Sequence, residues 1–276
     1  MEGRTVHRTT IGGPDVTAPT LDMTGRRILI SGASSGIGRA MAATFAGAGA
    51  ELVLVDIDQR GLELACTQLA DAGCATTRHA VLDLADKAQV DAFWDAGGSV
   101  PDTLINNAGI YPMRRFMELD KTALGRVMQV NLESLFWMCQ GFIRARGKLG
   151  GIIINVSSIE AYTAFKREMV AYTTSKTGVL GFTRALAKEF GRKGFRINAL
   201  VPGGIRTPGT SSVARRVMTK AEFGLIKTGW DFMQRLPLGR MGKPEEVANV
   251  ALFLASDLAT YVHGTAIAVD GGFLSA

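Results

Sequence analysis

The feature that most constrains the fold is a regular alternation of short aliphatic runs with longer stretches of helical periodicity. The strong runs, rich in β-branched and aliphatic residues, lie at 26–31, 51–57, 103–107, 151–156, 195–201 and 265–269, and a weaker one lies at 77–84. Between them, apolar residues recur every three or four positions, which indicates helices. Runs that are apolar on both faces and alternate with helices are typical of a parallel sheet covered on both sides. The pattern therefore predicts a doubly wound α/β fold with a parallel sheet of about seven strands.

The composition excludes several classes of protein. Of the 276 residues, 47% are hydrophobic and 20% charged, which suffices for one large core. The 31 basic residues are interleaved with 25 acidic ones, without the long basic run of a nucleic-acid binder. No apolar run approaches the ~20 residues that span a bilayer, and three cysteines and three histidines are scattered. We expect a soluble cytoplasmic protein with no nucleic-acid, membrane or metal partner.

The first residues differ from the rest. Residues 1–24 are polar and lack periodicity, so we expect a flexible leader there. No linker-like composition divides residues 25–276, which we assign to one domain.

A glycine-rich turn, SGASSGIG at 31–38, follows the first strand and precedes a helix. Glycines allow a tight turn and let a pyrophosphate approach the backbone amides at a helix N-terminus. The spacing differs from the common dinucleotide fingerprint, and a plain strand-to-helix turn explains the glycines equally well. Asp56, 20 residues beyond Gly36 at the end of the second strand, changes this balance. A carboxylate there accepts hydrogen bonds from adenosine ribose hydroxyls and repels a 2′-phosphate, which favours NAD over NADP. Arg39 could soften that preference, but we favour a solvent-facing role for it.

A second motif, AYTTSK at 171–176, places the Tyr172 phenol four residues before the Lys176 ammonium. In a helix the two side chains share one face, one turn apart. The run contains no acid to pair with the lysine. A surface pair and a proton-transfer device both fit this pattern.

From about Gly25 to Gly272 the chain closely resembles the short-chain dehydrogenase/reductase family. The motifs that carry the resemblance are, in order, SGASSGIG (31–38), Asp56, DL (83–84), NNAG (106–109), Asn131, Ser158, Tyr172 with Lys176, PGGIRT (202–207), LGRMGKPEEVANVALFLASD (238–257) and VDGG (269–272). Ser31 stands where the family usually has threonine. Ser158 precedes Tyr172 by 14 residues where 13 is usual, which indicates one inserted residue in 159–171 and affects the substrate loop rather than the catalytic set.

The resemblance implies a Rossmann fold and a catalytic set. Tyr172 would be the general acid and base, with a pKa lowered from about 10 by Lys176 and by the positive nicotinamide. Lys176 would also hold the nicotinamide ribose, and Ser158 would hydrogen-bond the reacting oxygen. Asn131 would orient the lysine through a water relay. Ser157 is the rival of Ser158, but the spacing from Tyr172 favours Ser158.

The resemblance also implies a set of residues that bind the cofactor NAD. Asp83 and Leu84 would flank the adenine, and Ile205 and Thr207 would meet the nicotinamide carboxamide. The full set is Gly32, Ser34, Ser35, Gly36, Ile37, Gly38, Asp56, Asp83, Leu84, Asn107, Ala108, Gly109, Tyr172, Lys176, Pro202, Gly203, Ile205 and Thr207. Taken alone, Pro202 and Gly203 are equally a plain turn after a strand.

The substrate is less constrained. Residues 208–235 fall where the family carries its mobile lid. Four cations and no acid lie between Arg206 and Lys220, either to attract an anion or, as we favour, on a solvated helix face. We assign Tyr111 and Tyr162 to packing, and place Glu160 near the pocket mouth, where a carboxylate would suit a hydroxylated substrate.

These expectations combine into one function. We expect an NAD-dependent oxidoreductase that moves a hydride between nicotinamide and a secondary alcohol or ketone. The alternatives are an NADPH-dependent 3-oxoacyl-thioester reductase, against which Asp56 argues, and a non-catalytic dinucleotide-binding sensor, against which the catalytic set argues. The segments 238–257 and 269–272 resemble the family's subunit contacts, so we expect a homotetramer, with a dimer as the alternative.

Overall fold

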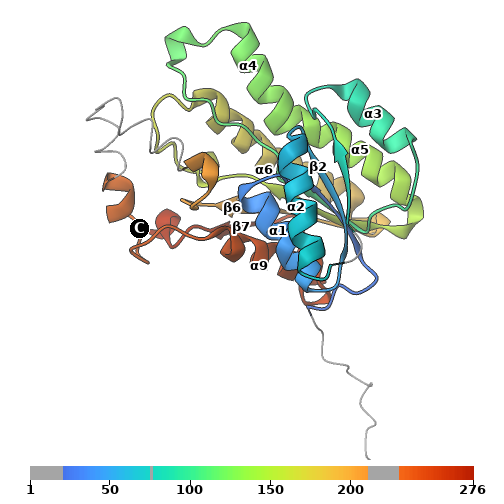
Figure 1. The fold of residues 1–276 in the computed structure, drawn as a ribbon. Helices are drawn as coiled ribbons and strands as arrows, with labels where there is room; N and C mark the ends of the chain where they lie inside the picture. The colour runs from blue at the N-terminus through green and yellow to red at the C-terminus, as the bar shows by residue number, and fades with distance from the viewer. Residues whose placement is uncertain (1–20, 75–76, 211–229) are drawn as a thin grey trace, which may run out of the picture.

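Seven strands form one sheet in the order β3-β2-β1-β4-β5-β6-β7. Figure 1 shows how the helices surround this sheet. The computed structural model describes residues 21–74, 77–210 and 230–276. The strands are β1 (Arg27–Ser31), β2 (Glu51–Asp56), β3 (Thr77–Val81), β4 (Thr103–Asn106), β5 (Gly151–Val156), β6 (Phe195–Pro202) and β7 (Ala266–Val269). Every neighbouring pair is parallel. The predicted parallel sheet of seven strands is confirmed.

Helices cover both faces of the sheet. They are α1 (Gly36–Gly47), α2 (Gln59–Asp71), α3 (Lys87–Asp95), α4 (Lys121–Met128), α5 (Ser134–Arg146), α6 (Val170–Phe190) and α9 (Pro244–Ala255). Ile28 and Ile30 of β1 pack into a cluster with residues of α1, α2 and α9, whereas Leu29 packs into a cluster with α3, α5 and α6. Successive strand residues point to opposite faces, so a sheet covered on both sides needs such continuous apolar runs. Among the described helices, none combines the length and apolarity needed to cross a membrane.

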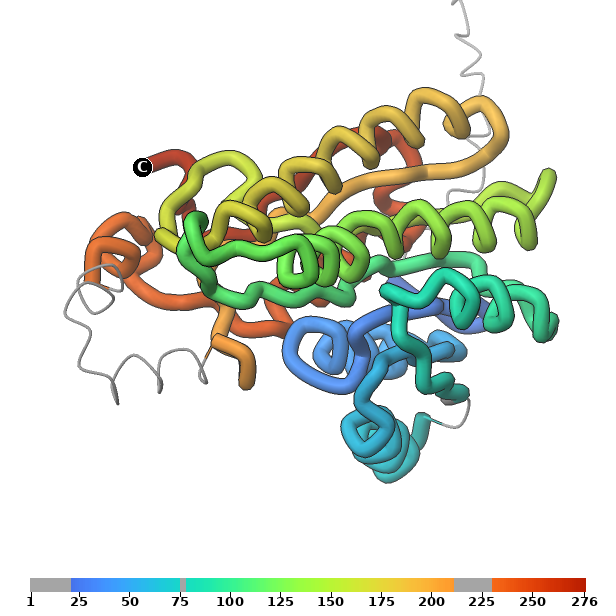
Figure 2. The backbone as a smooth tube through the Cα atoms, turned by 90° about the horizontal axis from the view of Figure 1, so that it is seen from above, coloured from blue at the N-terminus to red at the C-terminus, as the bar shows by residue number. Residues whose placement is uncertain are grey.

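The helical stretch predicted around 121–146 contains a local change of winding. A π-helical turn, Gln129–Glu133, joins α4 to α5. The chain continues in the same direction, and in Figure 2 α5 runs beside α6. Asn131 lies in this turn and is fully buried. Such turns often occur at functional sites, because the extra residue re-aims a side chain.

The predicted leader, residues 1–24, and the predicted lid, residues 208–235, are described only in part. Met23, which we placed in the leader, is only 2% exposed, and its amide donates to the carbonyl of Ala48 at 2.7 Å. The folded domain therefore includes residues 21–24, because the Met23 side chain fills the core cluster beside α1. Residues 1–20 of the predicted leader and 211–229 of the predicted lid lie outside the described residues, as do Arg215, Arg216 and Lys220.

Candidate active site

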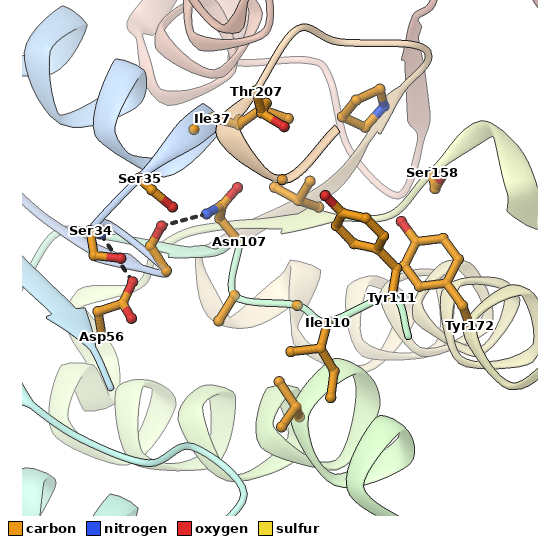
Figure 3. A pocket seen from close by; sticks show the side chains of 18 of the residues that line it. Ser34, Ser35, Ile37, Asp56, Asn107, Ile110, Tyr111, Ser158, Tyr172 and Thr207 are labelled. Atoms are coloured by element: carbon orange, nitrogen blue, oxygen red, sulfur yellow. Dashed lines mark hydrogen bonds between the residues drawn. The ribbon is translucent and has the colours of Figure 1, made fainter. Parts of the chain in front are cut away.

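A pocket opens at the carboxyl edge of the sheet, around the point where β1 and β4 are neighbours (Figure 3). In open α/β sheets, ligands bind in the crevice at such a switch point. The pocket is lined by every predicted cofactor residue except Gly38, and by the predicted catalytic residues Ser158, Tyr172 and Lys176. Gly38 and Asn131 are buried and are not part of the lining. Residues from the ends of six strands, β1 to β6, thus converge on one cavity.

The glycine-rich turn is built for close backbone approach. Gly32 has a φ of +66°, and a Cβ there would lie 2.8 Å from the Ala108 backbone. A Cβ at Gly38 would lie 2.0 Å from the carbonyl oxygen of Gly32, so β1 and α1 touch backbone to backbone. Ser35 is the N-cap of α1 and makes no side-chain capping bond. The turn therefore fits a dinucleotide pyrophosphate, which amide groups at a helix N-terminus would hold.

Asp56 stands at the end of β2 beside this turn. Its carboxylate accepts hydrogen bonds from the amides of Ser34 at 2.9 Å and Asp58 at 3.1 Å. These bonds fix the carboxylate in the pocket lining (Figure 3). The position suits an acceptor for the hydroxyls of a cofactor ribose.

Arg39 does not have the solvent-facing position that the sequence analysis favoured. Its guanidinium is partly buried and donates to the carbonyls of Ser34 and Gly61. Both carbonyls border the glycine-rich turn, so the side chain folds back and braces that turn against α2. The Nη2 atom of this guanidinium is thus bonded to the protein's own backbone, and Arg39 is not among the residues that line the pocket.

The NNAG segment is tied to β1 by side-chain bonds. The Ser31 hydroxyl accepts from the amides of Asn107 at 3.1 Å and Ala108 at 3.2 Å. The Asn107 side chain donates to the carbonyls of Ser31 and Gly32. A hydroxyl is all that these contacts require at position 31, which accounts for serine in place of threonine.

Asp83 forms an ion pair with Arg126, a residue that the sequence analysis did not single out. Both of its carboxylate oxygens accept from Nη1 of Arg126 of α4, at 2.9 and 3.1 Å. Arg126 also lines the pocket beside Leu84. In the sequence, the signal for a role of Arg126 near the pocket was its position five residues before Asn131. A lone arginine in a helical pattern does not reveal which strand end its side chain contacts.

The catalytic candidates meet at the start of α6. The Ser158 side chain and the phenol of Tyr172 line the same pocket, and Ser158 is close enough to lower the phenol pKa. The Ser157 hydroxyl instead donates to the carbonyl oxygen of Lys176 at 2.8 Å. Lys176 follows Tyr172 by one helical turn and is 4% exposed.

The electrostatics of this pair differ from our expectation. Burial raises the pKa of Tyr172 to about 12; the Ser158 hydrogen bond lowers it, and Glu160 and Tyr111 raise it further. Burial also lowers the pKa of Lys176 to about 8. The ammonium donates to the carbonyl of Val156 at 2.8 Å and lies 5.8 Å from the centre of the Tyr172 ring. Among the protein's own groups, desolvation outweighs a charge at that distance. The expected lowering of the phenol pKa, which includes the positive nicotinamide, stays a prediction.

Asn131 acts on the backbone around the lysine. Its amide donates to the carbonyl of Ile110 at 2.8 Å and to Ser175 Oγ at 3.1 Å, and its oxygen accepts from the Ile110 amide at 2.7 Å. A Cβ at Gly109 would lie 3.3 Å from the Lys176 ammonium and 3.4 Å from the Asn131 oxygen. The π turn thus joins the NNAG segment directly to α6. The expected water relay from Asn131 to the lysine stays a prediction.

Comparison with known proteins decides the family. A family model described as enoyl-(acyl carrier protein) reductase matches residues 32–274. Galactitol 2-dehydrogenase (L-tagatose-forming) of Cereibacter sphaeroides is 37% identical over 88% of this chain and 93% of its own length. The chain belongs to the short-chain dehydrogenase/reductase family. Another member, a 3-oxoacyl-acyl-carrier-protein reductase of Aquifex aeolicus, is 32% identical over 91% of this chain and 98% of its own.

A solved structure gives the same assignment. The protein from Agrobacterium tumefaciens, provisionally assigned as a 2-deoxy-d-gluconate 3-dehydrogenase and solved with bound NADP, superposes with a TM-score of 0.82. It is 33% identical and the match covers 93% of this chain and 99% of that one. The predicted family and Rossmann-type fold are confirmed. Known members of this family are oxidoreductases with varied substrates, so membership supports an NAD(P)-dependent enzyme and does not single out one substrate.

Within this short-chain dehydrogenase/reductase, two side chains lie elsewhere than expected. Tyr111, which we assigned to packing, lines the pocket with its ring centre 6.0 Å from that of Tyr172. Glu160, which we placed at the pocket mouth, is 6% exposed. Its carboxylate accepts from the amides of Phe165 and Lys166 and from the Thr173 hydroxyl. It therefore holds the loop before α6 and does not face a substrate.

Proposed function

We propose that this protein is an NAD-dependent oxidoreductase that moves a hydride between nicotinamide and a secondary alcohol or ketone. The observation that carries the proposal is the Tyr172 phenol, which lies beside Ser158 and one turn from Lys176 in a pocket that the glycine-rich turn also lines. A bound nicotinamide dinucleotide would supply the hydride chemistry. Asp56, the glycine-rich turn and Thr207 are the residues that would hold it.

The proton moves through the protein's own side chains. With its pKa raised to about 12 by burial, Tyr172 is protonated at neutral pH and ready to give its proton to a carbonyl oxygen. Ser158 donates a hydrogen bond to the same oxygen as negative charge develops there. In the reverse direction the phenolate takes the alcohol proton, and Lys176 one turn away favours that charged form when the ammonium is protonated.

The preference for NAD rests on Asp56. Its carboxylate is held by two backbone amides, so it cannot swing away from a ribose without losing both bonds. A 2′-phosphate at that place would meet a fixed negative charge. The NADP in the Agrobacterium structure is a reason to test both cofactors.

The reductase from Aquifex favours a second candidate, reduction of a 3-oxoacyl thioester. The galactitol dehydrogenase favours a polyol as the alcohol. Both reactions use the same phenol, so substrate turnover must separate them. We also propose that the protein is a cytoplasmic homotetramer.

One set of measurements tests the function. The fluorescence of NADH and NADPH, titrated with protein, is expected to show tighter NADH binding. A panel of polyols, simple secondary alcohols, cyclic and open-chain ketones and oxoacyl thioesters is then followed at 340 nm. We expect Tyr172→Phe to lose activity by about a thousandfold while its NADH affinity stays unchanged, because only the proton transfer is removed. Absence of turnover with every panel member, or near-normal activity of the variant, would refute the proposed function.

A further inference from the structure

Tyr111 occupies a place in the pocket that its sequence position does not reveal. It follows the NNAG segment by two residues, and its ring meets that of Tyr172 edge to face, at an interplanar angle of 72°. Figure 3 shows the two rings side by side in the cavity, with Ser158 beyond Tyr172. The ring of Tyr111 thus forms a wall directly beside the phenol that carries the proposed proton transfer.

The hydroxyl of Tyr111 reaches the opposite side of the pocket. It lies beside Gly209 and Thr207, at the end of the PGGIRT segment, and Thr207 partly offsets the burial that raises the pKa of this hydroxyl. A Cβ at Gly209 would lie 2.0 Å from the Tyr111 oxygen, so only glycine at 209 admits the hydroxyl there. The ring is therefore held at both ends, by Tyr172 on one side and by the segment 207–209 on the other.

The Thr207 end is itself well fixed. The Thr207 hydroxyl accepts from the Thr210 amide at 3.1 Å, and the Thr210 hydroxyl donates to the Ile205 carbonyl at 3.0 Å. A side chain packed against such a turn has few rotamers open to it. Tyr111 is therefore a rigid part of the wall.

The ring is placed to contact the substrate. A reacting carbonyl oxygen must lie within hydrogen-bond reach of both Tyr172 and Ser158. One substituent of its carbon then extends along the lining that Tyr111 provides, because Tyr111 is the aromatic neighbour of Tyr172 in the pocket. Burial raises the pKa of the Tyr111 hydroxyl, which keeps it a neutral hydrogen-bonding group.

We propose that Tyr111 determines which carbonyl compounds the site accepts, by limiting the size of the substituent beside the reacting carbon. This inference rests on the proposed function. The ring sets the limit, and the close approach of its hydroxyl to Gly209 keeps the ring in place.

Three variants separate these contributions. Tyr111→Ala removes the ring, Tyr111→Phe removes only the hydroxyl, and Tyr261→Ala is the matched control because Tyr261 is fully exposed. The probes are two methyl ketones with the same reacting group, butan-2-one and 4-phenylbutan-2-one, each reduced with NADH. The readout is the ratio of their kcat/KM values, with the NADH dissociation constant measured in parallel.

We expect Tyr111→Ala to shift this ratio toward the larger ketone by about tenfold or more, since pocket size discriminates by such factors. Tyr111→Phe should keep the ratio within about threefold, and Tyr261→Ala should leave it unchanged. All three should bind NADH as the wild-type protein does. A ratio that stays within about twofold in Tyr111→Ala, or an equal shift in Tyr261→Ala, overturns the proposal.

The same measurements distinguish failure of the size limit from failure of the proposed oxidoreductase function. If the wild-type protein reduces other carbonyls of the panel while neither methyl ketone is reduced by it or by Tyr111→Ala, the size limit is refuted and the proposed function stands. If no carbonyl or alcohol is turned over at all, both are refuted.

Discussion

At the scale of single residues, the buried Lys176 ammonium serves the proposed reaction but lowers the stability of the folded protein. Burial lowers its pKa from 10.5 to about 8, so the charged form is less stable in the folded protein than in the unfolded chain. Below about pH 8, Lys176 is protonated in both the folded and the unfolded protein, and the difference between its two pKa values lowers the stability of the fold by about 3 kcal/mol. As the pH rises from 8 toward 10.5, Lys176 loses its proton in the folded protein, and the destabilisation by the buried charge disappears.

We therefore expect Lys176→Met to be more stable than the wild-type protein at pH 7. The net gain is about 2 kcal/mol, because about 1 kcal/mol is lost with the hydrogen bond to the Val156 carbonyl. The advantage should shrink between pH 8 and 10. Urea unfolding of both proteins without cofactor, at pH 7 and pH 9.5, measures the difference, in which all other titrations cancel. A variant less stable at pH 7 would contradict the assigned cost of the buried charge.

Single residues also show how far the sequence could lead. The spacing of Tyr172 and Lys176 was enough to predict their shared helix face, since that depends only on local geometry. The orientations of Arg39 and Glu160 depend on carbonyls and amides brought in by other segments, and no local pattern encodes them. Tyr111 was assigned to packing for the same reason: its partners, Tyr172 and Thr207, are distant in the chain.

At the scale of elements, β1 and α1 depend on a contact that only glycine permits. The Gly38 Cα faces the Gly32 carbonyl, and an added Cβ would lie 2.0 Å from that oxygen. We expect Gly38→Ala to lower the free energy of unfolding by about 1–3 kcal/mol. It should also weaken NADH binding by about tenfold or more, because the displaced turn is the one that would hold the pyrophosphate.

The same helix supplies the control for that change. Gly47 also belongs to α1, and a Cβ there would meet nothing within 4 Å. Gly47→Ala should change stability by no more than about 1 kcal/mol, in the stabilising direction, and leave NADH affinity unaltered. Thermal unfolding and NADH fluorescence on both variants check this. Equal effects of the two substitutions would mean that the Gly38 contact is not what holds the turn.

The π turn marks the limit of sequence reasoning about elements. Apolar periodicity predicted one helical stretch around 121–146, and it is present as α4, the turn Gln129–Glu133 and α5. A single extra residue in one turn shifts that periodicity too little to be noticed. The winding is set by the bonds that Asn131 makes to Ile110 and Ser175, which exist only after the strands and α6 have come together.

At the scale of the whole molecule, two surfaces support association of several copies. β7 is an edge strand, paired only with β6 among the described strands, and its residues are half-buried or exposed. On α5, Phe136 is 41% exposed and packs against Phe182 of α6, with ring centres 4.4 Å apart and the rings tilted by 45°. Unpaired strand edges and exposed aromatic clusters are surfaces that soluble proteins usually cover. Two distinct surfaces of this kind suit an assembly with two kinds of interface, as a tetramer built as a dimer of dimers requires.

We expect light scattering after size-exclusion chromatography to give a mass of about 118 kDa, four chains of 29.4 kDa each. Phe136→Asp places a charge in the α5–α6 surface and should reduce the mass to that of a dimer, because a desolvated unpaired carboxylate destabilises the contact. Met117→Asp is the matched control, since Met117 is 91% exposed and lies in the turn Phe116–Glu118, away from that surface in the chain. Circular dichroism confirms that each variant is folded. A monomeric wild-type protein would refute the tetramer, and a Phe136→Asp protein that remains tetrameric would move its interfaces away from α5 and α6.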